Sequence, residues 1–150
     1  MLGGRLRRPK EKEYTLLLLN MLGQIEIKHM NTIIHSRNNK EIIEIIDDGL
    51  ILNNAQKFLD IAANCSSRNV IIHKENIIPE FFDLKTKIAG EILQKASNYK
   101  IRLGIVGEFK NIKSKSLRDF IYESNKTKEI LFKENIGDII DIFGKERGNS

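Results

Sequence analysis

The amino-acid sequence predicts a single α/β domain built on a mixed five-stranded sheet. Two β-branched runs, 32–35 and 41–46, flank an Asn-rich turn at 37–40. Because Asn tolerates the positive φ that tight hairpin turns require, these runs are typical of an opening antiparallel hairpin. Beyond residue 53, helical periodicity alternates with short apolar runs, which favours parallel strands joined by right-handed crossover helices. The chain of 150 residues is long enough for one domain and too short for two ordinary ones.

The first helix of the alternating part begins near residue 54. Asn53 or Asn54 is suited to cap it, because an Asn side chain accepts hydrogen bonds from free backbone N–H groups. The spacing i, i+3, i+4, i+7 of one apolar helix face then follows at Ala55, Phe58, Leu59 and Ala62. The next strand is predicted at 70–72, where continuous apolar residues indicate a strand covered on both faces.

A long amphipathic helix is predicted between this strand and the following one at 101–106. The apolar residues on its buried side are Phe81, Leu84, Ile88, Ile92 and Leu93. Pro79 suits the approach or the first turn, since its missing N–H costs nothing there. Gly90 should cost about 1 kcal/mol relative to Ala in a helix interior, so we expect it to permit a close approach to the sheet.

A polar loop at 108–115 leads into the third helix of the alternating part. Ser116 and Asp119 resemble a capping box at its start, and the inward side consists of Leu117, Phe120, Ile121 and Ser124. A last strand at 129–132 and a last helix at 136–143 complete the domain. The predicted domain is therefore 31–143, with an extension at 1–30 and a frayed tail at 144–150.

Positive charge is concentrated ahead of this domain. Residues 1–30 contain six Lys or Arg and three Glu, so only two of the five net positive charges belong to the rest of the chain. Because a nucleic-acid footprint should lie on the binding domain itself, we do not expect a nucleic-acid partner. We expect the extension to be disordered or to lie outside the domain, with either Met1 or Met30 as the true start.

Two further features of the sequence bear on location. The apolar run 14–22 is shorter than the roughly 20 residues that cross a bilayer, and no small-residue cleavage site follows it. Cys65 is the single cysteine, so it forms no internal disulfide. A reducing cytoplasm is therefore the expected location, with no membrane association.

Three stretches, IIPEFFDLKTKIAGEILQKASNY, IRLGIVGEF and SKSLRDFIYESNK, resemble a bacterial family known as domain of unknown function family 4180. The resemblance covers 31–143 and implies no activity. More remotely, the order of elements is similar to the STAS domains of anti-sigma-factor antagonists. That likeness implies a regulatory module with a phosphorylated Ser or Thr at a helix start. Asp83 matches the acidic position of the STAS motif, but no Ser or Gly follows it, and Thr86 lies one turn further on.

The candidate binding residues follow the predicted strands at two helix starts. In open α/β sheets, ligands favour the crevice beyond the carboxyl ends of the strands. We expect Asp83 and Lys85 to orient or pair groups there, and Ser116 and Arg118 to hold an anionic group. The complete candidate set for a ligand or protein partner is Asp83, Lys85, Thr86, Ser116, Arg118 and Tyr122, the last as an amphipathic anchor. Simple helix capping and a solvated helix face would explain the same residues.

No motif for a metal, a nucleotide or a nucleophilic catalyst is present. His29, His35 and His73 are scattered, although His35 and His73 could approach each other on neighbouring strands. We therefore predict no metal, no cofactor and no catalytic residue, and a non-catalytic regulatory or interaction domain that binds a protein partner or a small anionic ligand. The alternative is a small hydrolase-like enzyme with Asp83 or Glu80 as the base near Ser116 and Arg118.

Overall fold

The computed structural model describes residues 30–49 and 51–145. They form one five-stranded sheet in the order β1-β2-β3-β4-β5, in which β1 is antiparallel to β2 and all other neighbours are parallel. Two opening strands followed by alternating helices and strands confirm the predicted fold class. The elements are β1 (Asn31–Arg37), β2 (Lys40–Ile46), α2 (Ala55–Ala63), β3 (Asn69–His73), η1 (Lys74–Asn76), η2 (Pro79–Phe82), η3 (Leu84–Thr86), α3 (Ile88–Tyr99), β4 (Arg102–Val106), α4 (Lys115–Thr127), β5 (Ile130–Lys133) and α5 (Ile136–Phe143).

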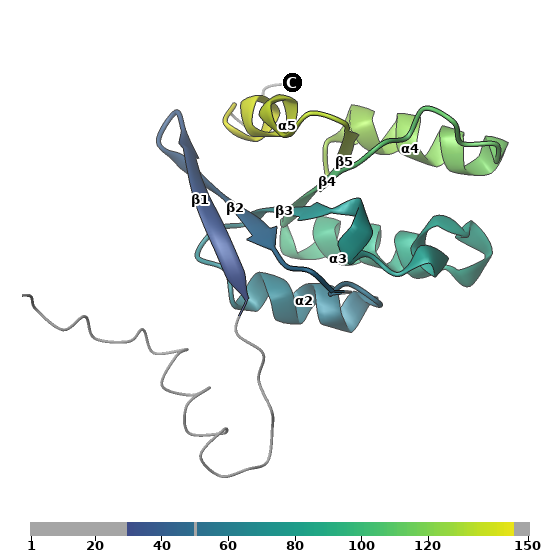
Figure 1. Cartoon of the computed structure of the whole chain (residues 1–150), viewed down its shortest axis with the longest axis horizontal. Coiled ribbons are helices and arrows are strands. Elements are labelled where there is room, and N and C mark those ends of the chain that lie inside the picture. The colour runs from purple at the N-terminus through teal and green to yellow at the C-terminus, as the bar shows by residue number, and fades with distance from the viewer. Residues whose placement is uncertain (1–29, 50, 146–150) are drawn as a thin grey trace, which may run out of the picture.

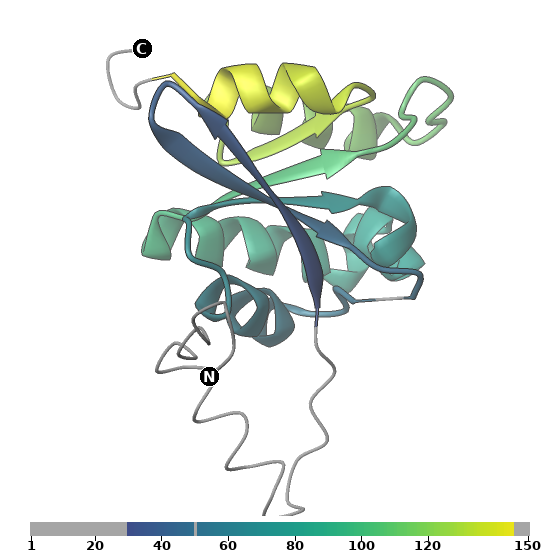
Figure 2. The ribbon, with the colours of Figure 1, turned by 60° about the vertical axis from the view of Figure 1, so that its left-hand side comes forward.

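The sheet separates two apolar layers (Figure 1). Helices α2 and α3 cover one face, and α5 covers part of the other. Figure 2 shows the same arrangement from another side, with the β1–β2 hairpin at the edge of the sheet. The larger cluster includes Phe58, Phe81 and Ile92, each at most 1% exposed, and α4 adds Phe120 against it. The smaller cluster joins α5 to the opposite side of β2, β3 and β5.

Asparagines form the hairpin turn, as the sequence predicts. Asn38 and Asn39 have φ values of 55° and 64°, the left-handed pair that two-residue hairpin turns require. Asn54 is the residue that caps α2, and its Oδ1 accepts a hydrogen bond from the Lys57 N–H at 2.7 Å.

The predicted long helix after β3 is wrong in its first half. The segment 74–86 contains three short 3-10 turns, η1, η2 and η3, and α3 begins only at Ile88. Lys87 has a φ of 68°, which interrupts a right-handed helix, and the Thr86 hydroxyl donates to the carbonyl oxygens of Glu80 and Asp83. The local hydrogen bonds of this segment therefore replace the helical ones.

The role predicted for Gly90 is also wrong. A Cβ built on Gly90 meets nothing within 4 Å, so the residue faces open space rather than the sheet. The close approach occurs instead at Gly104 in β4, where a Cβ would lie 2.6 Å from Ile139 Cγ2 of α5.

Candidate functional site

The first predicted corner lies in the 3-10 turns between β3 and α3. Asp83 Oδ1 accepts a hydrogen bond from the Lys85 N–H at 3.2 Å and so caps η3. Asp83 and Lys85 are exposed, whereas Thr86 is partly buried and its hydroxyl is used within the turn. These residues shape the backbone that leads into α3.

The second predicted corner is the start of α4. Ser114, rather than Ser116, caps the helix: its Oγ accepts from the Leu117 N–H at 3.2 Å. The predicted capping box is therefore wrong, and Asp119 pairs with Lys115 one turn earlier, at 2.8 Å. Ser116 lies exposed in the first turn of the helix.

Arg118 and Tyr122 are both exposed on α4. The Arg118 Nη1 donates to the carbonyl oxygens of Ile112 and Lys113, each at 2.9 Å, and so holds the loop before the helix. Tyr122 is 64% exposed, with the Lys126 ammonium 5.1 Å from its ring centroid. Arg118 has a structural role in the loop, and Tyr122 is a largely exposed aromatic side chain of this helix.

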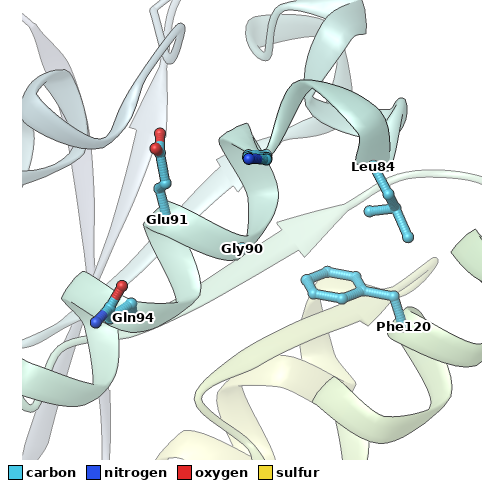
Figure 3. A pocket seen from close by; sticks show the side chains of 6 residues that line it. Leu84, Gly90, Glu91, Gln94 and Phe120 are labelled. Atoms are coloured by element: carbon cyan, nitrogen blue, oxygen red, sulfur yellow. The ribbon is translucent and has the colours of Figure 1, made fainter.

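A groove lies between the two corners. It has a volume of about 330 Å³ and is lined by Leu84, Lys87, Gly90, Glu91, Gln94 and Phe120. Figure 3 shows Leu84 of η3 and Phe120 of α4 pointing toward each other, while Glu91 and Gln94 lie further along α3, on the other side of Gly90 from Leu84. The groove is thus lined by residues next to the predicted ones in the sequence. Leu84 lies between Asp83 and Lys85 in the chain, and Phe120 lies between Arg118 and Tyr122. Because Gly90 has no side chain, the groove has free space at this position of α3.

A cluster of titratable side chains lies elsewhere, on the sheet face that α5 partly covers. Glu44 of β2 accepts from His35 Nε2 of β1 at 2.8 Å through Oε1, and from His73 Nε2 of β3 at 2.7 Å through Oε2. The two histidines lie on the strands that flank β2, rather than on neighbouring strands. Their side chains are 27% and 29% exposed, whereas that of Glu44 is 9% exposed.

The histidines keep Glu44 ionised in this cluster. Burial alone would raise the pKa of the Glu44 carboxyl, but the hydrogen bonds and positive charge of His35 and His73 outweigh it, so the pKa lies below its ordinary value. Because an ionised carboxylate only accepts, each imidazole carries a proton on Nε2.

The two imidazoles contact different oxygens of one carboxylate instead of converging on a common point. Within the described residues, no group of three His, Cys, Asp or Glu side chains is placed to hold a metal ion. His29 lies outside the described residues. The sequence pattern did not reveal Glu44 as the centre of this cluster, although it indicated that His35 and His73 could come near each other.

Comparison with known families identifies the family. The family model described as "Domain of unknown function (DUF4180)" matches residues 37–142. The chain belongs to the DUF4180 family. No curated protein matches this DUF4180 chain. None of the helices in residues 30–49 and 51–145 has the length and apolar character to cross a bilayer.

Proposed function

We propose that this DUF4180 domain is a non-catalytic interaction domain that binds a protein partner in the groove between α3 and α4. The observation that carries the proposal is the groove itself, in which the apolar side chains of Leu84 and Phe120 are accessible between two helices. Apolar pockets of this kind accept the anchor side chain of a partner.

The rim of the groove favours a polypeptide over a small anion. Lys87 and Glu91 contribute opposite charges to the lining, and Gln94 contributes an amide. A partner that inserts an apolar side chain could pair polar groups with both charges, whereas the opposite charges of Lys87 and Glu91 give a small anion no net attraction. Tyr122, exposed on the same helix as Phe120, would extend the contact.

The polar residues near the groove support binding rather than catalysis. Asp83 caps a turn and Arg118 donates to two carbonyl oxygens of its own loop. A hydrolase would need these groups to converge on one substrate atom within hydrogen-bond reach. The STAS-like order of elements favours a regulatory role by analogy alone, and we place that role in the cytoplasm.

Gly90 provides the test. Because a Cβ at this position meets nothing within 4 Å, Gly90→Phe should place its ring in the groove, and circular dichroism checks that the variant is folded. Ser97→Phe is the matched control, since Ser97 is exposed on the same helix and does not line the groove. Each variant is immobilised, and proteins captured from host extract are compared with those captured by the wild-type domain.

We expect one polypeptide to bind the wild-type domain and Ser97→Phe, and to be lost from Gly90→Phe. With that polypeptide purified, titration calorimetry should show binding at least about tenfold weaker to Gly90→Phe, equivalent to about 1.4 kcal/mol. A partner that binds all three forms equally well would refute the groove as the site. Turnover of a substrate by the domain would refute the non-catalytic role.

A further inference from the structure

The first strand, β1, presents an open edge of the sheet. It contacts β2 on one side, and no strand of the described residues pairs with its other side. Six of its seven residues are exposed, among them Ile33 at 48% and Ile34 at 58%. Each side of a strand carries backbone N–H and C=O groups, so this edge offers a row of donors and acceptors next to accessible aliphatic side chains.

Arg37, at the end of β1 and paired with Asp141 of α5, is the one permanently charged residue on this edge strand, and the other usual protections are missing from it. Its sequence, NTIIHSR, contains neither Pro nor Lys, and its pairing with β2 runs without a bulge from Asn31 to Arg37. The opposite edge differs, because β5 is only four residues long and three of them are buried. An unprotected strand of seven residues is a template for another strand.

We propose that this edge pairs with β1 of a second copy of the chain, which joins two sheets into one continuous sheet of ten strands. Two identical edges pair in antiparallel fashion about a twofold axis perpendicular to the sheet. Such an axis leaves every side chain on the face of the sheet that it already occupies. Because residues directly opposite each other in an antiparallel pair share a face, the register must place one residue of β1 opposite its own copy. With Ile34 at that position, all seven residues of β1 are paired.

The side chains are compatible with this register. Ile34 packs against Ile34 of the second copy, and Thr32 stands opposite Ser36. On the other face, Ile33 stands opposite His35 and Asn31 opposite Arg37. Arg37, the permanently charged residue of β1, is paired with Asp141 of its own chain and would stand opposite an amide, and the two arginines lie at opposite ends of the paired strands. Like charges directly opposite each other would destabilise a cross-strand pair, and this register places none opposite each other.

Because Ile34 stands opposite its own copy, opposite charges introduced at this position test the interface. All measurements use the full-length chain. The wild-type protein should dimerise in a concentration-dependent way in light scattering coupled to size exclusion. Ile34→Lys and Ile34→Glu each place like charges opposite one another, so each variant alone should dimerise at least about tenfold more weakly. An equimolar mixture places Lys opposite Glu, and native mass spectrometry should then show the mixed dimer.

Tyr99→Lys is the control, because Tyr99 is 52% exposed and lies on α3, away from β1. It should dimerise like the wild-type protein, and so should the groove variant Gly90→Phe, which separates this surface from the proposed partner site. Circular dichroism checks that all variants are folded. A wild-type protein that stays monomeric at every concentration, or an Ile34→Lys variant that dimerises normally, would overturn the β1 interface.

Discussion

Replacement of Glu44 by Gln tests the energetic role of the cluster on β1, β2 and β3. The carboxylate accepts from His35 at 2.8 Å and from His73 at 2.7 Å while it is 9% exposed. A hydrogen bond to a charged group contributes about 1.5–3 kcal/mol. Gln retains one acceptor, but its NH₂ group faces the N–H of the other imidazole. The lower cost of burying a neutral group offsets part of the loss, which leaves about 2 kcal/mol of destabilisation for Glu44→Gln.

Urea unfolding followed by circular dichroism at several pH values gives the free energy of unfolding of both forms. Because the pKa of Glu44 is lower in the folded state than its ordinary value of about 4.5, its contribution is present above that pH and is lost as the pH falls through the folded pKa. The difference between wild type and Glu44→Gln should therefore be largest near neutral pH and should shrink below pH 4.5. Glu41→Gln, an exposed change on the same strand, is the control. A Glu44→Gln variant within about 0.5 kcal/mol of wild type at neutral pH would refute this account.

Three further substitutions test the packing of α5 and α3. Gly104→Ala should lose about 1–3 kcal/mol of unfolding free energy, since its Cβ would lie 2.6 Å from Ile139 Cγ2, whereas Gly90→Ala should gain up to about 1 kcal/mol because its Cβ meets open space. Thermal unfolding of both variants should show shifts of opposite sign, and equal shifts would contradict the packing. Arg102→Lys should cost about 1–3 kcal/mol in urea unfolding, because the Arg102 Nη2 donates to the Phe143 carbonyl at 2.7 Å and its guanidinium lies 4.6 Å from the Phe143 ring, a geometry that Lys cannot reproduce. An unchanged midpoint for Arg102→Lys would show that the end of α5 is held by other contacts.

The fold was predictable because its signals are local. Asn38 and Asn39 favour a left-handed turn whatever surrounds them, and the run 136–143 shows a helical pattern that coincides with α5. The continuous apolar run in β3 likewise indicates a strand with both faces covered, as Val70, Ile71 and Ile72 are. Such signals depend on neighbouring residues alone.

The errors arose where a periodic pattern and a backbone conformation disagree. Phe81, Leu84 and Ile88 have helical spacing, but Lys87 adopts a left-handed conformation that no propensity scale assigns to Lys. The turns before α3 therefore escaped prediction. The capping error has a similar cause, because Ser114 and Ser116 are both good capping residues and only the path of the loop decides between them.

The position of Glu44 shows why a site of long-range origin stays hidden in a sequence. In the run EIIEII, a glutamate between isoleucines is compatible with a solvent-facing position on an alternating strand. The Glu44 side chain is instead only 9% exposed, and a buried carboxylate requires partners. Those partners lie 9 and 29 residues away, on β1 and β3. They become its neighbours because the hairpin places β1 on one side of β2 and the crossover through α2 places β3 on the other. Recognition of the cluster therefore depends on strand order, which must be known before the chemistry of Glu44 can be inferred.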